Sequence, residues 1–240
     1  MSEADGLPPG VGTTPSPPTV DYRHICAAAS IAYHGLKFAH EAANSQIGKK
    51  DDIATKVQLL GMRNLYLRHI MFEIANVAEV AGMAKSLYKD HADLGEAYKK
   101  IAKGAEFFKY IRNKFVGHLT PELTAKAFEW IPHCYEVMGD TDPAKGTVLT
   151  WFILETAINT YTDPASGHKI FDTETDLNYP PDRTRFLNYL GRTADDTLAY
   201  AELLITTSAA YVTFPDLKAD LIPLAMKAGE TDFTFLAKKR

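Results

Sequence analysis

Apolar side chains recur every three or four residues along most of the chain from Asp21 onward. This is the spacing of helices that bury one face against a core. The first such stretch, 21–44, has little turn chemistry and carries apolar residues at Ile25, Ala28, Ala32, Leu36 and Ala39. The pattern therefore predicts one long amphipathic helix over this stretch.

The next stretch, from Ile53 to about Tyr88, is the most apolar in the chain. Its apolar side chains go nearly all round the expected helix, at Leu59, Leu60, Leu67, Ile70, Met71, Ile74, Val77 and Val80. A helix that is apolar on all sides packs against several neighbours. We therefore expect this helix at the centre of the fold, with Asp51 or Asp52 as its N-cap.

The remaining periodic segments predict further helices, separated by capping or turn residues. Thr120 and Pro121 have the form of a cap followed by proline at the first helical position. The expected helices cover residues 90–120, 121–139, 141–163, 182–214 and 216–229. No segment alternates apolar and polar residues with the period of two that strands show. The predicted fold class is all-α, a bundle of long helices.

Composition divides the chain into three parts. Residues 1–20 are rich in proline and glycine and almost lack large apolar side chains, so we expect a disordered tail there. Residues 21–225 are expected to form a single helical domain, followed by a loose C-terminal end at 226–240. The acidic stretch 163–182 is expected to be the only long interior loop, and solvated.

The overall composition, with 46% hydrophobic and 23% charged residues among 240, is that of an ordinary globular protein. The net charge of -4 gives no attraction for nucleic acid over the whole surface, so any site for a polyanion must be local. The apolar stretches are too interrupted by charge to span a bilayer, and we find no secretion signal. We therefore expect a cytoplasmic protein with no membrane partner, in which Cys26 and Cys134 act as small buried apolar residues.

An Arg-Asn pair followed by a histidine occurs twice, as RNLYLRH at 63–69 and as RNKFVGH at 112–118. In the first copy six helical positions separate Arg63 from His69, so their side chains point about 120° apart. We therefore interpret this copy as part of the scaffold. The spacing of four residues also predicts two side-chain pairs on this helix, Asn64 with Arg68 and His69 with Glu73.

The second copy differs because the helix is not expected to continue through it. Gly117 precedes His118, and Thr120 with Pro121 follows, so the helix should end or bend and free the histidine. The residues before it are strongly basic against Glu106 alone: Lys99, Lys100, Lys103, Lys109, Arg112 and Lys114. Aromatic residues lie among these cations, a combination that suits stacking beside phosphate. The five lysines are therefore candidate RNA-binding residues.

The string YIRNKFVGHL resembles the signature of the HEPN superfamily, helical domains marked by an arginine, an adjacent polar residue and a histidine after four to six intervening positions. Arg112, Asn113 and His118 occupy these positions here, with five residues between the arginine and the histidine. The abortive-infection type of HEPN domain is the most similar subgroup. The resemblance covers about residues 21–140, and Gly117 stands where the family more often has alanine.

The resemblance implies an endoribonuclease or RNA-binding protein that uses neither metal nor cofactor, in phage defence or in a toxin–antitoxin pair. Arg112 would hold the scissile phosphate, His118 would transfer protons, and Asn113 would fix the arginine or a substrate oxygen. The RNA 2′-hydroxyl would attack and leave a cyclic phosphate. Each subunit of a homodimer contributes one motif in the family, so the expected partners are RNA, a second copy, and an antitoxin or regulatory protein.

Two other functions stay open at this point. The basic stretch would be an ordinary solvated face in a non-catalytic helical module for protein interaction, and some superfamily members keep the motif yet only bind partners. A bundle that binds a small molecule or a metal is the third possibility. The acidic residues at 172, 174 and 176 lack the glycine and glutamate of a calcium loop. The group of Glu129, His133 and Cys134 lacks a fourth zinc ligand.

Overall fold

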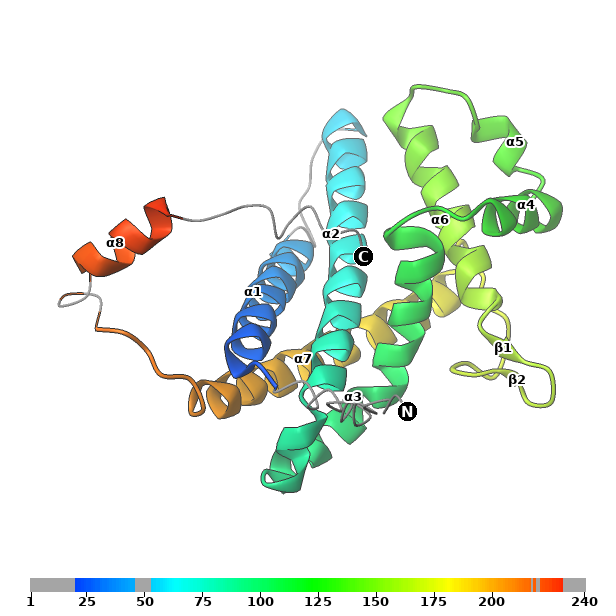
Figure 1. The fold of residues 1–240 in the computed structure, drawn as a ribbon. Helices are drawn as coiled ribbons and strands as arrows, with labels where there is room; N and C mark the ends of the chain where they lie inside the picture. Colours follow the sequence, from blue (N-terminus) through cyan, green and yellow to red (C-terminus); the bar gives the residue numbers. More distant parts are fainter. Residues whose placement is uncertain (1–19, 46–52, 217, 219–220, 231–240) are drawn as a thin grey trace, which may run out of the picture.

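The computed structural model describes residues 20–45, 53–216, 218 and 221–230, and these are mostly helical (Figure 1). The long helices are α1 (Tyr22–Ser45), α2 (Ile53–Met83), α3 (Ala92–Ile111), α6 (Pro143–Asn159) and α7 (Pro180–Ala209). The short elements are η1 (Lys85–Lys89), η2 (Arg112–Val116), α4 (Pro121–Trp130), α5 (Cys134–Val137), β1 (Thr162–Asp163), β2 (Gly167–His168) and α8 (Leu221–Gly229). The prediction of an all-α bundle of long helices is confirmed.

Helix α2 lies at the centre of the bundle, in contact with α1, α3, α6 and α7. Helices α1, α2 and α3 lie side by side in Figure 1, and α7 crosses behind them. The predictions of a central second helix and of an amphipathic first helix are confirmed. The buried face of α1 consists of Ile25, Ala29, Ala32, Leu36, Ala39 and Ala43. Leu60 departs from the expected core because it faces a cavity between α2, α6 and α7, and it is 45% exposed.

Helix α3 and helix α7 approach each other closely at Gly104. This glycine is buried, and a Cβ atom added to it would lie 2.6 Å from Cγ2 and 2.8 Å from Oγ1 of Thr193. Real side-chain atoms do not approach so closely, so only glycine fits at this point of α3. The missing side chain lets α7 pass close to α3 at this point.

Several predicted boundaries are corrected by the structure. The helix expected over 121–139 ends at Trp130, because Pro132 disfavours helical geometry in the residue before it. Ile131 accordingly has φ -126° and ψ 81°, and only the short α5 follows. The helix expected over 90–120 changes to a π-helical turn at Arg112. A short antiparallel pair, with Thr162 opposite His168, was not predicted because two residues are too few to show alternation.

Helix α8 continues past Ala225 to Gly229, and all its residues are exposed. The expected disordered tail lies outside the described residues except for Val20, and so do the N-cap expected at Asp51 or Asp52 and the last ten residues. Among the helices that the structure describes, none is long and apolar enough to cross a bilayer.

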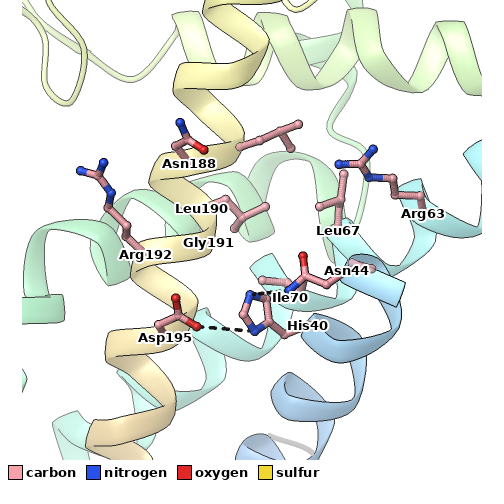
Figure 2. Close-up of a pocket in the computed structure, with 12 residues that line it drawn as sticks. His40, Asn44, Arg63, Leu67, Ile70, Asn188, Leu190, Gly191, Arg192 and Asp195 are labelled. Carbon is pink, nitrogen blue, oxygen red and sulfur yellow. Dashed lines mark hydrogen bonds and ion pairs between the residues drawn. The ribbon is translucent and has the colours of Figure 1, made fainter. Parts of the chain in front are cut away.

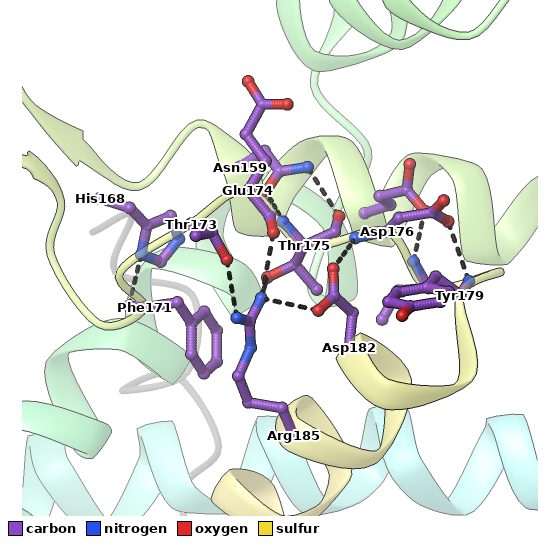
Figure 3. A network of polar contacts seen from close by, with 12 residues as sticks. Asn159, His168, Phe171, Thr173, Glu174, Thr175, Asp176, Tyr179, Asp182 and Arg185 are labelled. Atoms are coloured by element: carbon purple, nitrogen blue, oxygen red, sulfur yellow. Dashed lines mark hydrogen bonds and ion pairs between the residues drawn. The ribbon is translucent and has the colours of Figure 1, made fainter.

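The segment between α6 and α7 is bound by side chains of both helices (Figure 3). The side chain of Asn159 donates to the carbonyl of Thr175 at 2.9 Å and accepts the N–H of the same residue at 2.8 Å. Arg185 of α7 donates to the hydroxyl of Thr173 at 2.8 Å. Two apolar side chains of the segment are buried, Phe171 and Leu177. Most side chains of the segment are exposed, as expected of a solvated loop, while polar groups from the two flanking helices hold its backbone.

Glu155 of α6 binds this segment as well. Its Oε2 accepts the N–H of Leu177 at 2.7 Å. Burial raises the pKa of Glu155 to about 7 from an ordinary value of 4.5, and the charges of Asp176 and Asp182 act in the same direction. The folded protein therefore holds this proton more tightly than the unfolded chain does. The stability that protonated Glu155 contributes is complete below pH 4.5 and is lost as the pH rises to about 7.

We expect Glu155→Gln to remove the loss of stability that ionisation of Glu155 causes as the pH rises. The glutamine has the shape of the protonated carboxyl group, and its oxygen still accepts the N–H of Leu177. At pH 8 the variant should be more stable than the wild type by roughly 1–2 kcal/mol, because water partly screens the charge of this half-buried carboxylate, and near pH 4.5 the difference should vanish. Urea unfolding at both pH values measures this, and an equal effect at both would contradict the assignment.

Candidate functional site

The second Arg-Asn motif coincides with the π-helical turn η2. The N–H of Gly117 donates to the carbonyl of Arg112 at 2.8 Å, five residues back, instead of four as in an α-helix. The N–H of Thr120 then donates to the carbonyl of Lys114 at 3.2 Å, and the chain leaves the helix before α4. The prediction that the helix ends or bends at this motif is confirmed. Such π-helical turns are rare and frequently lie at functional sites.

The guanidinium of Arg112 is held by side chains of α2 and by its own neighbour. Nη1 donates to Oδ1 of Asn76 at 3.1 Å, and Nη2 donates to a carboxylate oxygen of Glu79. Nε and Nη2 both donate to Oδ1 of Asn113, at 3.1 and 3.0 Å. These contacts leave the side chain 14% exposed and leave one of its five N–H groups without an acceptor among the described residues. The arginine is therefore oriented before any ligand arrives.

A chain of polar contacts along α2 joins the two Arg-Asn motifs. Nε2 of His69 lies 3.4 Å from Oε1 of Glu73, and Oε2 of Glu73 accepts a hydrogen bond of 2.9 Å from Asn76, which binds Arg112. His69, Glu73, Asn76 and Glu79 follow one another at three- and four-residue spacing, so they lie on one side of the helix. The histidine of the first motif and the arginine of the second thus belong to one network.

The first motif only partly matches its predicted contacts. The pair of His69 with Glu73 is confirmed. The pair of Asn64 with Arg68 is wrong, because the guanidinium of Arg68 lies over the ring of Phe115 instead, 5.1 Å from its centroid. The amide of Asn64 is buried, and in the described part of the chain neither of its polar atoms has a hydrogen-bond partner.

Helix α1 leaves room for the carboxylate of Glu73. This side chain is only 6% exposed, and a Cβ atom added to Gly35 would lie 2.8 Å from its Oε1. Sequence reasoning treated Glu73 as an ordinary helix contact and did not single out Asn76 or Glu79. The available signal was a row of polar residues that continues from His69 at helical spacing through an otherwise apolar helix.

A shallow hollow of about 310 Å³ opens beside this network. It is lined by Leu65, Arg68, His69, Phe72 and Val116, so it lies between α2 and η2. The ring of His69 stacks on Phe72, with centroids 6.2 Å apart and planes 18° apart. The hollow therefore offers an aromatic surface, a cation and an imidazole to a ligand.

His118 is exposed and makes no hydrogen bond or ion pair within the described ranges. It follows the π-helical turn and does not line the hollow. The structure therefore brings Arg112 and Asn113 together, while His118 stays free for an external partner. The bend at Gly117 was expected to leave the His118 side chain without contacts to the helix, and the structure agrees with this.

The five predicted RNA-binding lysines differ in exposure and in their contacts. The hydrogen bond from Arg112, and to a smaller extent the charge of nearby Lys109, lowers the pKa of the Glu79 carboxyl group. Lys114 is half-buried. Lys99 pairs with Glu96, whereas Lys100 and Lys103 are exposed on α3 without a partner among the described residues. Only part of the basic stretch is thus available to a polyanion.

The combinations considered as metal sites have other contacts. Nδ1 of His133 lies 2.9 Å from a carboxylate oxygen of Glu136, and the buried thiol of Cys134 donates to the carbonyl of Ala127. Asp176 accepts N–H groups of its own turn. No group of three or more His, Cys, Asp or Glu residues is placed to hold a metal ion in the described part of the chain.

Comparison of the chain with protein-family models, with curated proteins and with solved structures finds no match. A proposal about function must therefore rest on the residues of this chain and on their geometry. The most informative geometry is the network that links His69, Glu73 and Asn76 to Arg112 at the π-helical turn.

Proposed function

We propose that this chain is a HEPN-like RNA-binding protein that cleaves RNA without a metal ion, in the cytoplasm, in phage defence or as the toxin of a toxin–antitoxin pair. The observation that carries the proposal is the π-helical turn at RNKFV together with the network that orients Arg112. A helix distortion and a partly buried polar network both involve Arg112, a residue that matches the superfamily signature, and helix distortions of this kind are frequent at functional sites.

In this proposal Arg112 binds the scissile phosphate. An RNA phosphate would take the place of the Glu79 carboxylate on Nη2 and would also use the remaining N–H of the guanidinium. Asn76 and Asn113 keep the planar group in position during this exchange. The exposed lysines, Lys100 and Lys103, add attraction that weakens with salt.

Two imidazoles can supply the proton transfers. One of them accepts the proton of the 2′-hydroxyl as that oxygen attacks the phosphorus. The other protonates the departing 5′-oxygen, and a 2′,3′-cyclic phosphate remains. His118 is one such group, and His69, oriented by the buried carboxylate of Glu73, is a second in the same chain. The second copy of the motif in a dimer is the other source of an imidazole.

A ribonuclease assay on purified protein tests this proposal. Single-stranded RNA should be cleaved equally with and without a chelator, and the products should carry 2′,3′-cyclic phosphate ends. Loss of cleavage in the chelator, or products with 3′-hydroxyl ends, would exclude the proposed chemistry. Absence of both cleavage and binding at low salt would exclude RNA as the ligand.

We expect Glu79→Gln to increase the affinity for single-stranded RNA by about threefold to tenfold at low salt. The change removes the anion that competes with phosphate for Arg112, while the amide oxygen can still accept from Nη2. The matched control is Glu106→Gln, which removes an exposed carboxylate from α3 away from Arg112. Filter binding of both variants measures the effect, and an equal gain in the control would mean that only net charge matters.

Exposed apolar side chains on α1 and α2, of which Leu65 lines the hollow, support the second candidate, a module for protein interaction. Ile31 and Phe38 of α1 and Leu65 of α2 are each more than half exposed, and we refer to them as the α1–α2 apolar face. If the protein cleaves RNA, we propose that a second copy covers the α1–α2 apolar face in a homodimer, which brings the hollow of one copy near that of the other. If the protein is a non-catalytic interaction module, an antitoxin or regulatory protein covers the same face. Light scattering on the wild type and on Leu65→Glu separates a dimer from a monomer.

A further inference from the structure

A cavity of about 420 Å³ lies between α2, α6, α7 and the segment before α7, away from the π-helical turn. Its polar lining consists of Arg63 from α2, Thr147 from α6, Asn178, and Arg183 from the first turn of α7. The remaining wall consists of Trp151 and of leucine and valine side chains. Figure 2 shows Arg63 extending from α2 toward α7, above an adjacent cavity that shares this residue. No lining residue is shared with the hollow beside η2.

The polar side chains of this cavity have no partner in the described part of the chain, and two of them, Asn178 and Arg183, are exposed to solvent. Arg63, Thr147, Asn178 and Arg183 make no side-chain hydrogen bond or ion pair with any residue that the structure describes. Thr147 is the least exposed of them, at 8%, and its hydroxyl is still accessible from the cavity. The half-buried Arg185 of the same helix, in contrast, binds Asp182 and Thr173.

The cavity also has a one-sided charge. Among the residues that the structure describes, two arginines line it and no carboxylate does. The nearest acids along the sequence are already engaged, since Asp176 accepts backbone N–H groups and Asp182 pairs with Arg185. Two guanidinium groups without partners in a concave, mostly apolar setting suit an anion, and phosphate fits their planar N–H geometry best.

We infer that this cavity binds a small aromatic phosphate of the nucleoside monophosphate class. Arg63 and Arg183 hold the phosphate, and the ring packs against Trp151 and the leucine wall. Thr147 and Asn178 provide the hydrogen bonds for the polar edge of the ring or for the sugar. The volume lies in the range of small-molecule sites, which is large enough for one such ligand. The inference does not depend on ribonuclease activity at Arg112.

Isothermal titration of the full chain with AMP, GMP, CMP and UMP tests this inference. At least one nucleotide should bind with 1:1 stoichiometry and a dissociation constant below about 1 mM. Arg63→Gln and Arg183→Gln should each weaken binding by about tenfold or more, because each removes a charge-assisted contact to phosphate. The matched control is Arg192→Gln. This arginine of α7 also lacks a partner among the described residues, but it lines only neighbouring cavities and should stay within about twofold of the wild type.

A second variant tests the site without changing charge. Val148 lines this cavity and is partly exposed, so Val148→Trp should fill the space and abolish nucleotide binding while circular dichroism stays unchanged. Failure of all four nucleotides to bind at millimolar concentration would overturn the inference. If inorganic phosphate binds as tightly as the nucleotides, the ring does not contribute to binding. If Arg192→Gln loses as much nucleotide affinity as Arg63→Gln and Arg183→Gln, the ligand does not bind in this cavity.

Discussion

Replacing His118 with alanine is expected to lower the rate constant for RNA cleavage by about 10²- to 10⁴-fold while RNA affinity changes little. The imidazole is exposed and has no partner among the described residues, so its loss removes proton transfer without disturbing the fold. The matched control is His133→Ala, which removes another exposed histidine whose contact is with Glu136. Single-turnover cleavage of a labelled RNA, together with its binding constant, separates the chemical step from affinity.

The variant Arg112→Lys completes this test because it keeps the positive charge and removes the planar guanidinium group. A lysine ammonium cannot bind Asn76, Glu79 and phosphate with fixed planar geometry, so RNA should still bind but be cleaved poorly. If both the histidine and the arginine variants cleave like the wild type, the motif is scaffold and the interaction module becomes the better proposal. If both lose binding as well as cleavage, thermal unfolding will show whether the fold was damaged.

Gly104→Ala is expected to destabilise the protein by about 1–3 kcal/mol, although alanine is the better helix former. The added methyl group would lie 2.6 Å from Cγ2 of Thr193, and the two helices must separate to accept it. For a chain of this size the change corresponds to a fall of about 2–12 °C in the unfolding midpoint. Calorimetry on the variant measures the loss.

The second-site change Thr193→Ala provides the control for this prediction. It removes the two atoms that lie nearest to the new Cβ and leaves Cβ of residue 193 at 3.3 Å, so Gly104→Ala combined with Thr193→Ala should recover most of the stability of Thr193→Ala alone. A gain in stability from Gly104→Ala in the wild-type background would mean that α3 and α7 are not in close contact. Additive losses in the double variant would mean that the clash is not with Thr193.

The helical fold could be predicted because each long helix carries its burial pattern in its own sequence. Ile25, Ala32 and Leu36 recur at helical spacing and all of them are buried. The order in the segment between α6 and α7 could not be predicted in this way. It depends on Asn159 and Arg185, which bind that segment from the two flanking helices, and nothing in the segment itself indicates these partners.

The candidate site was predictable only in part, because some of its contacts join different helices and cannot be read from one segment of sequence. Arg112 and Asn113 are neighbours in sequence, and their contact follows from that. The link from Arg112 to Asn76 and Glu79 arises where α3 packs on α2, so it is a property of the fold. Likewise Arg63 was assigned to the scaffold, and only the packing of α6 and α7 reveals that it faces a cavity with Arg183.

The π-helical turn has a consequence for how such a site can arise and disappear. A π-helical turn is equivalent to an α-helix with one extra residue, so a single codon separates the two forms. Loss of one residue between Arg112 and Gly117 would restore a regular helix and rotate everything after it by about 100°. Arg112 would stay in its network on α2, whereas His118 would move to another side of the helix. One short deletion in the gene would therefore separate the arginine from its histidine without altering either residue.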